Sequence, residues 1–579
     1  MNRLSHAYQY CLFFYFLFGM HFLLDTSGGS GLYYSFNVIG WICVTVMLSI
    51  TLWYISNTRT LYYSYFHLLL LLGLFLLIIP LFYQGEFTEH AIPRLLGLTG
   101  GILFLISFSQ FNQGNVEQTT TLTHSINYSA EYSNNKPNKS WCFLWFILIG
   151  VSIQASVGLV EVFFLKKGMW AGFNPELHRP FGLFMQPNVM ASFMATGLIL
   201  SLYLFSFNKV KNYNRITVVF LYFCLVSTSF LIWLLQSRTG YLGFLFAFVC
   251  ITGYLYKVNK HQLFIHILLI ISSCYLAYNL SRVSNNTSYV QRDTAIYQDA
   301  GVRTDIYSVS LKMIKEKPVL GYGYGSFERS YLDFYNQLLS DNPELKKELS
   351  PPQQKLSHPH NELLYWAIEG GVFAILGLLC FAWAYLSILM KLPPLTALAM
   401  LALVTPIMLH SQTEFPFYAA VSHWLTLLIF IFYSHTLTAT VDKKITITRS
   451  FLLRFLSLLL SAIFLPFLAT TLHTTYLVTQ YEKSHLKQVK QLNNIINPLP
   501  WRTKIENNMY NAILLDGIKN KNEEKLIRYI TWGLQRIKYA PRQSIYINLL
   551  LCMQVLNMDK EYHQLLYEAQ TTYPLKIDW

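Results

Sequence analysis

Charged side chains are scarce in this sequence, and their scarcity limits what the chain can be. Asp, Glu, Lys and Arg make up 12% of its 579 residues, whereas about 25% is typical of soluble domains. Hydrophobic residues make up 53%, and many lie in runs long enough to cross a hydrocarbon layer roughly 30 Å thick. These features argue against a soluble enzyme, a disordered scaffold and a secreted disulfide-rich domain.

Patterns for metal, disulfide and nucleotide sites are also missing. The eight cysteines include no Cys-x-x-Cys pair and seven lie in apolar runs, so we expect buried thiols without a disulfide framework or a zinc site. The glycine series at residues 321–325 lacks the preceding strand and the Lys-Ser/Thr ending of a P-loop, and we interpret it as a turn. We therefore expect no metal ion, no cofactor and no nucleic-acid partner.

The apolar runs predict an all-α polytopic membrane protein with about 13 transmembrane helices, in a range of about 12 to 14. The predicted starts lie near Ala7, Ser35, Leu61, Ala91, Trp141, Pro187, Arg215, Thr239, Gln262, Asn361, Leu392, Phe417 and Phe451. The two runs around Arg238 could instead form one broken helix. Short segments on the side of the N-terminus hold thirteen Lys and Arg residues, against four on the other side. Because positive residues remain cytoplasmic, we expect a cytoplasmic N-terminus.

This orientation divides the chain into five regions. The tail alternates charged and apolar residues at helical spacing and is interrupted by Pro and Gly, which predicts four or five short helices similar to a tetratricopeptide array. The tail could bind a partner or only stabilise the protein. The regions are residues 1–140, N-terminal transmembrane helices with a flexible cytoplasmic loop; 141–280, transmembrane helices with external Arg, Gln and Asn motifs; 281–360, a large external loop; 361–478, C-terminal transmembrane helices; and 479–579, the external helical tail.

The external loop ends in a histidine motif directly before an apolar run. Asn361 is a good N-cap for the helix that follows, and Pro359 favours an extended backbone at His358. The imidazole of His360 would then lie at the outer mouth of the membrane domain, beside a helix N-terminus that favours anions. A neutral imidazole there could take a proton from an acceptor hydroxyl. The alternative is a helix-capping histidine at a wet interface.

Two arginines could bind an anionic substrate. Arg238 lies between two apolar runs at the outer boundary, where its guanidinium could present two parallel donors to a phosphate or merely extend to the interface. Arg303 directly precedes an amphipathic stretch at residues 306–314. Arg94 and Glu369 also lie in apolar runs, and we expect both to be solvated because each is near the end of its run.

Further polar residues could line the same external site. Arg179, Gln186 and Asn188 belong to an external segment that leads into the next span, and His410 and Glu414 belong to a short turn between two later spans. An ordinary polar hairpin is the alternative for that turn. A base, two arginines and a polar rim suit transfer from a lipid-linked pyrophosphate donor, because arginine can hold its phosphates without a metal.

In these motifs the sequence resembles the O-antigen ligase superfamily. That superfamily's signature has His, then Asn, Ser or Gln, then nine residues, Gly, two residues and Gly, Thr or Tyr. His360, Asn361 and Gly371 fit it, and Ala374 departs from it at the last position. The resemblance implies that His360 is the essential histidine.

Other positions follow from the same resemblance. It makes His358 a neighbour of the essential histidine. It places the family's external arginine, found in a Ser-Arg-small motif, on Arg238, and its loop arginine on Arg303. The two arginines would hold the pyrophosphate of the donor.

Two further segments resemble the PglL-type bacterial protein O-oligosaccharyltransferases in particular. Residues 179–188, which read Arg-Pro-Phe-Gly and then Gln-Pro-Asn, are similar to that branch's N-terminal ligase motif. Residues 410–416 are similar to its His-x-x-x-Glu-x-Pro element. On this resemblance Arg179, Gln186, Asn188, His410 and Glu414 have supporting or acceptor-side roles, together with His358 and Asn361.

The resemblance implies a Gram-negative inner-membrane enzyme whose active site and C-terminus face the periplasm. Such an enzyme moves a glycan en bloc from undecaprenyl pyrophosphate to Ser or Thr hydroxyls of a periplasmic acceptor protein, for example pilin. The lipid bilayer is its further partner. The nearest alternative is an O-antigen ligase that joins O-polysaccharide to lipid A-core, and a multi-span transporter is an alternative from a different class.

Overall fold

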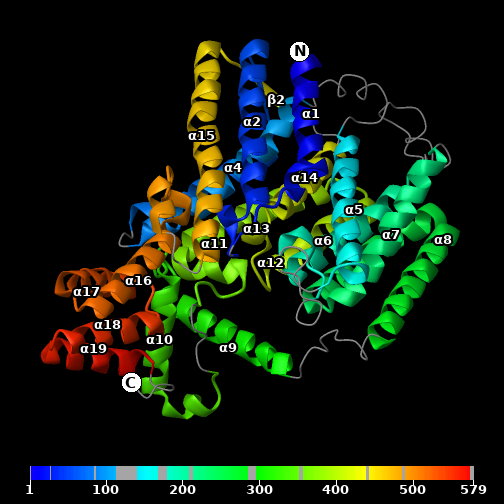
Figure 1. The fold of residues 1–579 in the computed structure, drawn as a ribbon. Coiled ribbons are helices and arrows are strands. Elements are labelled where there is room, and N and C mark those ends of the chain that lie inside the picture. The colour runs from blue at the N-terminus through cyan, green and yellow to red at the C-terminus, as the bar shows by residue number, and fades with distance from the viewer. Residues whose placement is uncertain are drawn as a thin grey trace. The chain divides into compact units, whose positions relative to one another are not determined.

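The computed structural model describes residues 2–26, 28–83, 87–111, 140–166, 179–207, 213–283, 295–350, 356–438, 442–484 and 489–573. Within these ranges the regular structure is helical apart from two short strands (Figure 1), so the all-α prediction is confirmed. The chain divides into two compact units. Unit 1 comprises Met1–Leu71, Leu98–Gln291 and Cys380–Tyr476, and unit 2 comprises Leu72–Gly97, Arg292–Leu379 and Leu477–Trp579.

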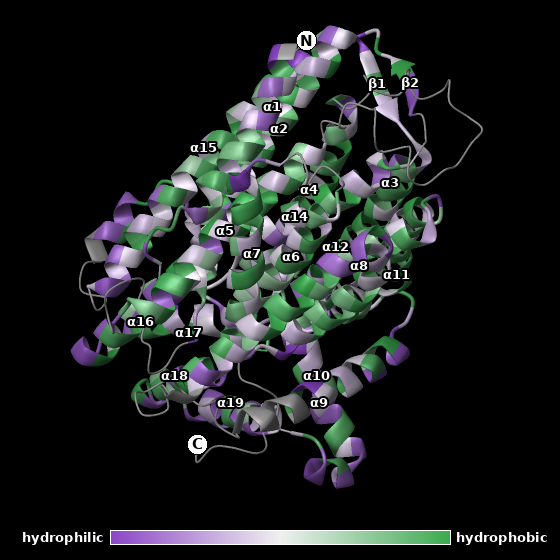
Figure 2. Cartoon of the chain, turned by 90° about the vertical axis from the view of Figure 1, so that its right-hand side faces the viewer, coloured by the Kyte–Doolittle hydropathy of each residue, from purple (hydrophilic) through white to green (hydrophobic). Residues whose placement is uncertain are grey.

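Ten helices in the described ranges are long and apolar enough to cross a membrane, and the chain is a multi-pass membrane protein. Their interiors are rich in Leu, Ile, Val and Phe, and Figure 2 shows them as mostly hydrophobic. They are α2 (Ser35–Thr58), α3 (Tyr65–Ile78) continued by η3 (Ile79–Phe82), α4 (Ile92–Phe111), α5 (Trp141–Phe163), α6 (Pro187–Phe205), α7 (Arg215–Leu235), α8 (Arg238–Val283), α11 (Glu362–Leu389), α12 (Pro394–Ser411) and α15 (Ser450–Lys483).

Each of the predicted membrane runs corresponds to a helical segment, although two of these segments are shorter than predicted. The first and twelfth are α1 (Asn2–Leu17) and α14 (Val421–Thr436), which have only 16 residues each. The two runs after Arg238 are two helical segments within α8, as predicted, and they are separated by a kink at Asn259, where φ is −162° and ψ is 96°. The runs on either side of Arg238 are separate helices, because α7 ends at Leu235. The number of membrane crossings stays a prediction.

Helix α6 forms the centre of unit 1. It packs against α5, α7, α8 and α12. In its most apolar 18-residue stretch, 94% of the residues are buried. A helix that is apolar on every side belongs in a core, and after Asn188 the residues of α6 are apolar, aromatic or small. Because α6 is enclosed, the polar residues at its N-terminus are fixed by the helices around it.

Two strands of unit 1 join parts of the chain that are far apart in sequence. Strand β1 (Thr60–Tyr63) pairs antiparallel with β2 (Lys443–Thr446), and Tyr63 lies opposite Lys443. Strand β1 replaces the first turn of the helix predicted near Leu61, and α3 therefore begins only at Tyr65. The expected flexible cytoplasmic loop falls largely on residues 112–139, outside the described residues.

In unit 2 the large loop folds into helices α9 (Ala295–Glu316) and α10 (Phe327–Asp341), which share a core with the first part of α11. The amphipathic helix predicted over residues 306–314 begins earlier, so Arg303 lies inside α9 and not before it. The apolar stripe that includes Ile306 extends one turn upstream to Val302, and this extension accounts for the difference.

The tail in unit 2 contains four α-helices that pack each against the next, as predicted. They are α16 (Arg502–Asn520), α17 (Glu523–Ile537), α18 (Gln543–Val555) and α19 (Asp559–Thr572). The N-cap of α17 is Asn522, whose side chain accepts a hydrogen bond from the backbone of Lys525 at 3.0 Å. Shorter elements are η1 (Gly19–His21), η2 (Gly31–Tyr33), η4 (Thr88–His90), η6 (Gly182–Phe184), η9 (Pro343–Lys347), α13 (Pro416–Ala419), η10 (Val489–Asn494) and η11 (Leu499–Trp501).

The tail is attached to the loop helix α10 by polar contacts. Arg542 donates from Nε to Glu328 Oε1 at 3.0 Å, and Asn336 Nδ2 donates to the carbonyl of Thr572 at 2.9 Å. Both contacts lie within unit 2. The tail therefore packs on the same loop that precedes the histidine motif.

Candidate functional site

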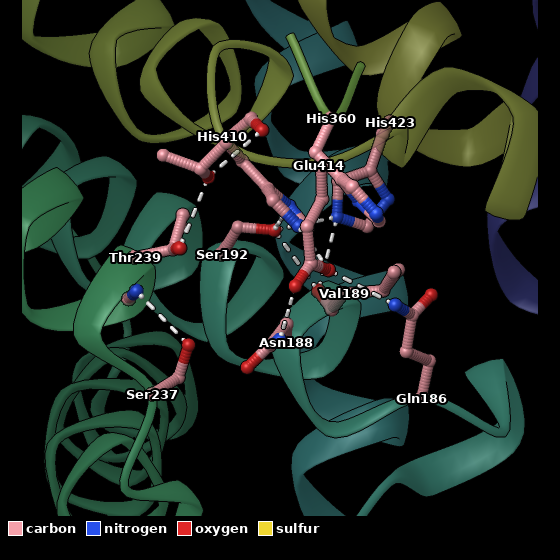
Figure 3. Close-up of polar contacts among 12 residues, drawn as sticks. Gln186, Asn188, Val189, Ser192, Ser237, Thr239, His360, His410, Glu414 and His423 are labelled. Carbon is pink, nitrogen blue, oxygen red and sulfur yellow. Dashed lines mark hydrogen bonds and ion pairs between the residues drawn. The ribbon is translucent and has the colours of Figure 1, made fainter. Parts of the chain in front are cut away.

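Glu414 is the centre of a hydrogen-bonded cluster in unit 1 (Figure 3). Its Oε2 accepts from Gln186 Nε2 at 2.9 Å, and its Oε1 accepts from Asn188 Nδ2 at 2.6 Å. Gln186 is the N-cap residue of α6, and Pro187 begins the helix with a backbone already suited to it. The structure thus brings together three predicted residues from segments more than two hundred positions apart.

A chain of side chains connects Glu414 to the interior of unit 1. His410 lies one helical turn before Glu414, with its Nε2 3.4 Å from Glu414 Oε2. Its Nδ1 lies 2.7 Å from Ser192 Oγ, which is 3.1 Å from Nε2 of His423. His423 Nε2 is also 3.1 Å from the carbonyl of Val189. His410, Ser192 and His423 are fully buried.

At each end of this chain the acceptor determines the direction of the hydrogen bond. A carbonyl and a carboxylate can only accept, so His423 Nε2 carries a proton toward Val189, and His410 Nε2 carries one toward Glu414. The single hydroxyl proton of Ser192 lies within reach of two acceptors, His410 Nδ1 at 2.7 Å and the carbonyl of Val189 at 3.1 Å. Three donors consequently converge on Glu414, which fixes its carboxylate in place.

The Ser-Arg-small motif begins helix α8. Ser237 Oγ accepts from the backbone of Gly240 at 3.2 Å and caps the helix. The hydroxyl of Thr239 lies 3.0 Å from that of Thr413, in the turn that carries Glu414. The serine and threonine therefore have structural roles, and Arg238 is left exposed at the first position of α8.

Arg179 stabilises the turn between α7 and α8. Its Nη1 donates to the carbonyl of Leu235 at 2.6 Å and to that of Gln236 at 3.1 Å. These carbonyls end helix α7, and Gln236 has the left-handed φ of 44°. Arg179 thus positions the turn that leads to Arg238.

Two buried residues of α5 hold the segment after Arg179, and the sequence interpretation missed both. Glu161 Oε2 accepts from the backbone of Phe181 at 2.9 Å and of Gly182 at 2.8 Å. Gln154 Oε1 accepts from the backbone of Leu183 at 3.0 Å. An acidic residue within an apolar run is a signal that could have identified Glu161. Ser192 and His423 were also missed, because a serine or histidine in an apolar run carries little information by itself.

The histidine motif in unit 2 has an unusual backbone. His360 has a left-handed φ of 55°, which is uncommon for a residue with a side chain. Its N–H donates to His358 Nδ1 at 3.4 Å, and its carbonyl accepts from the hydroxyl of Tyr307 at 3.1 Å. Asn361 caps α11 as expected, since its Oδ1 accepts from the backbone of Leu364 at 2.9 Å.

Helix α9 presents Arg303 toward the same turn. Tyr307, which binds the carbonyl of His360, lies four residues after Arg303 on α9. Residues four apart lie on the same helix face. The face of α9 that contacts the histidine motif is therefore the face that carries Arg303.

Helix α11 is broken at the signature glycine. Gly371 has φ 58° and ψ −145°, and a Cβ added there would lie 2.3 Å from the carbonyl oxygen of Val319. The N–H of Val372 donates to this carbonyl at 3.1 Å, and the N–H of Gly323 donates to the carbonyl of Glu369 at 2.9 Å. The glycine-rich segment at residues 321–325 is a turn, as predicted, and it inserts where the helix is broken.

The expectation that Arg94 and Glu369 are solvated is wrong. Their side chains form an ion pair at 2.7 Å and are only 6% and 0% exposed. The guanidinium lies 4.2 Å from the ring centre of Tyr365 and 4.0 Å from that of Trp366, and Glu369 Oε1 accepts from the backbone of Phe327 at 3.1 Å. The glycine turn and α10 cover the pair, and burial is tolerated because the two charges compensate each other.

The predicted site residues fall into one group in each unit. The first group is Arg179, Gln186, Asn188, Arg238, His410 and Glu414, and the second is Arg303, His358, His360 and Asn361. Their union in one external site stays a prediction.

Comparisons with known proteins find similarity along much of the chain. The family described as "O-Antigen ligase" matches residues 223–379, which include Arg238, Arg303 and His360. The family described as "Protein glycosylation ligase" matches residues 180–205, and "Virulence factor membrane-bound polymerase, C-terminal" matches residues 398–577.

One curated relative is the "General O-oligosaccharyltransferase" of Acinetobacter baylyi (strain ATCC 33305 / BD413 / ADP1). It is 26% identical over 218 residues, which are 35% of this chain and 36% of the relative. The match therefore spans about a third of the length of each protein.

Proposed function

Because these similarities confirm that the chain resembles the O-antigen ligase superfamily and its protein-glycosylating branch, we propose that it is an O-oligosaccharyltransferase. It moves a glycan en bloc from undecaprenyl pyrophosphate to Ser or Thr hydroxyls of periplasmic proteins such as pilin. The observation that carries the proposal is the left-handed backbone of His360 at the capped start of α11. Strained backbone of this kind persists where the surrounding structure enforces it, and it is common at active sites.

His360 acts as the base in this reaction. The acceptor oxygen attacks the anomeric carbon, and the Nε2 or Nδ1 of neutral His360 takes the hydroxyl proton. The bond between the anomeric carbon and the pyrophosphate oxygen breaks, and its electron pair leaves with undecaprenyl pyrophosphate. A single displacement of this kind inverts the anomeric configuration.

Arg238 and Arg303 bind the pyrophosphate and stabilise its developing charge. Each guanidinium can donate two parallel hydrogen bonds to phosphate oxygens. Loss of one such group elsewhere costs roughly 3 kcal/mol of transition-state stabilisation. The exposure of Arg238 at the start of α8 and the position of Arg303 on the α9 face near His360 support these roles.

The Glu414 cluster supports the acceptor side. Gln186 and Asn188 donate hydrogen bonds from their amide NH₂ groups to Glu414. Because these bonds fix the orientation of each amide, its side-chain carbonyl oxygen can accept a hydrogen bond from a hydroxyl. A rim held in this way needs little reorganisation when the acceptor binds.

The protein would lie in the inner membrane of a Gram-negative bacterium. The excess of Lys and Arg on segments on the N-terminal side supports a cytoplasmic N-terminus. With this orientation the histidine motif and the tail face the periplasm, where the acceptor proteins are found.

Co-expression with a glycan-assembly pathway and a pilin tests the proposal. We expect the intact mass of the pilin to rise by the mass of one whole glycan. His360→Ala should abolish the shift, whereas His563→Ala, which removes an exposed histidine of α19, should retain it. A fully active His360→Ala variant that is present in the membrane would refute the catalytic role.

An O-antigen ligase is the second candidate, because the longer of the two ligase matches, over residues 223–379, is to the family of that name. The same cells distinguish the two functions. Glycan on lipid A-core without glycan on any protein would replace the protein-acceptor proposal with this one.

A further inference from the structure

A second candidate site lies in unit 1, among residues to which the proposed reaction assigns no role. A cavity of about 270 Å³ opens where α3 begins and where α11 and α14 end. Its lining includes Tyr63, Ser64, Tyr65, Lys391, His435 and Lys443. All of these residues belong to unit 1, so the cavity is defined within one compact body.

The two-stranded sheet forms one wall of this cavity. Tyr63 and Lys443 are directly opposite each other in the sheet, and both line the cavity. Side chains alternate between the two faces of a strand, so Tyr62 and Lys444, the next pair, face the other side. Figure 2 shows strands β1 and β2 side by side, with hydrophilic residues in β2.

The wall is held firmly by the helices beneath it. The side chain of Gln110 binds both backbone groups of Tyr62, accepting at 2.9 Å and donating at 2.9 Å, and so replaces a third strand. His67 accepts at Nδ1 from the backbone of Ser64 at 3.0 Å, and its Nε2 lies 2.9 Å from Ser109 Oγ. These contacts keep Tyr63 and Ser64 in place at the cavity.

The charge of the lining favours an anion. Lys391 and Lys443 each bring an ammonium group with three donors. The described residues that line the cavity include no acidic side chain. Asp442, which precedes Lys443, interacts with the lining residue His435, and the two lysines exceed this one carboxylate by one charge. A phosphate group matches this arrangement, because lysine binds phosphate as a point charge.

The rim of the cavity favours a ligand with an apolar part. Leu68, which also lines the cavity, is 50% exposed, and Met390, adjacent to Lys391, is 60% exposed. Both lie on or beside helices apolar enough to cross a membrane. Basic pockets at the ends of membrane helices are suited to anionic lipid headgroups.

We propose that this cavity binds the phosphate headgroup of an anionic phospholipid, with Lys391 and Lys443 as its donors and Leu68 and Met390 against its acyl chains. With the orientation proposed above, the lipid comes from the cytoplasmic leaflet. The bound lipid joins β1, β2 and the end of α11, and it therefore stabilises unit 1. This assignment does not depend on the transferase activity.

Native mass spectrometry of the full chain, released from phosphatidylcholine nanodiscs that contain phosphatidylglycerol with the same acyl chains, tests this proposal. We expect the wild type to retain phosphatidylglycerol in preference to phosphatidylcholine. The double variant Lys391→Gln/Lys443→Gln should lose roughly tenfold in retention, because two charge-assisted contacts disappear. The control Lys444→Gln removes the same charge from the other face of β2 and should behave as wild type.

Three results would overturn the proposal. In the first, the wild type retains both lipids equally. In the second, the double variant retains as much phosphatidylglycerol as the wild type. In the third, the Lys444→Gln control loses as much phosphatidylglycerol as the double variant. The comparison of phosphatidylglycerol with phosphatidylcholine on the wild type tests the proposal even if the double variant does not fold. A thermal-shift arm with inorganic phosphate separates the sources of the ligand. If inorganic phosphate stabilises the protein as much as phosphatidylglycerol does, the ligand of the cavity is a free anion, and the proposal of a lipid ligand is wrong.

Discussion

Three donors converge on Glu414, and its carboxylate is suited to all of them. Gln186 and Asn188 donate from amide nitrogens, and His410 donates from Nε2. A glutamine at position 414 would place an NH₂ group against one of these donors. An unsatisfied buried donor costs about 1–3 kcal/mol.

Glu414→Gln should therefore lower glycan transfer by roughly tenfold or more, while the protein remains in the membrane. The measurement is the rate of glycan appearance on the acceptor at equal protein levels. Glu344→Gln is the matched control, since Glu344 is exposed on η9. If the Glu414→Gln variant transfers glycan at the wild-type rate, the cluster has no part in the reaction.

A substitution at Arg238 tests whether this side chain binds the phosphates of the donor. A lysine keeps the charge at position 238 but cannot reproduce two parallel donors, so Arg238→Lys should reduce transfer by roughly 100-fold. Arg215→Lys makes the same replacement at the other end of α7, where the side chain is also exposed, and should have little effect. If both variants transfer glycan equally well, Arg238 does not bind the donor.

Sequence reasoning identified the polar residues of external segments but not their buried partners. Gln186, Asn188 and Glu414 were expected at one site, and the structure brings them together. Glu161 and His423 were missed, because their partners are backbone atoms and side chains distant in sequence. Only the packing of α5, α6 and α12 shows which polar groups in apolar runs are satisfied.

At the level of secondary structure, the break in α11 explains the signature glycine. Gly371 adopts a positive φ, and the turn at residues 321–325 inserts against it. The spacing from His360 to Gly371 is therefore the length of one rigid helical segment. That segment also carries Glu369, whose side chain binds Arg94 and the start of α10.

Gly371→Ala should destabilise this arrangement by about 2 kcal/mol or more, because the backbone conformation is strained for alanine and its Cβ would lie 2.3 Å from a carbonyl oxygen. Thermal unfolding in detergent checks the loss of stability. Gly253→Ala is the matched control, since its Cβ would meet only the end of the Leu395 side chain, at 3.2 Å. An unchanged melting temperature in Gly371→Ala would contradict the helix break.

The attachment of the tail should depend on pH through His90. Its ring stacks on Tyr539 of the tail, with ring centres 4.4 Å apart. Burial lowers the pKa of His90 below its ordinary value of 6.5, Arg536 and Arg502 lower it further, and Glu89 and Glu506 oppose them. A lowered pKa in the folded state means that the attached tail disfavours the proton. The contribution is therefore present above about pH 6.5 and is lost as the pH falls below that value.

Limited proteolysis of the tail should accordingly be faster at about pH 5.5 than at about pH 7.5. His90→Gln should show a smaller difference between the two pH values, because glutamine does not titrate. Comparison of the two proteins at each pH removes the pH dependence of the protease itself. The same difference in both proteins would exclude His90 as the cause.

At the level of the whole molecule, the apolar runs predicted the helices well because burial and length determine them. Each predicted run has a helix, and the four tail helices were also expected. The break at Gly371 and strand β1 were not predicted, since tertiary contacts determine both. The buried pair of Arg94 and Glu369 shows the same limit, because local sequence does not show what covers a charge.

We propose that this chain alone transfers a whole glycan from a lipid pyrophosphate to a protein hydroxyl, with His360 as the base. The most direct measurement uses the purified protein in liposomes with an undecaprenyl-pyrophosphate-linked glycan and a pilin. We predict that the pilin gains the mass of one intact glycan for each undecaprenyl pyrophosphate released, and that His360→Ala releases none. Release without a mass gain on the pilin, or equal transfer by His360→Ala, would contradict the account.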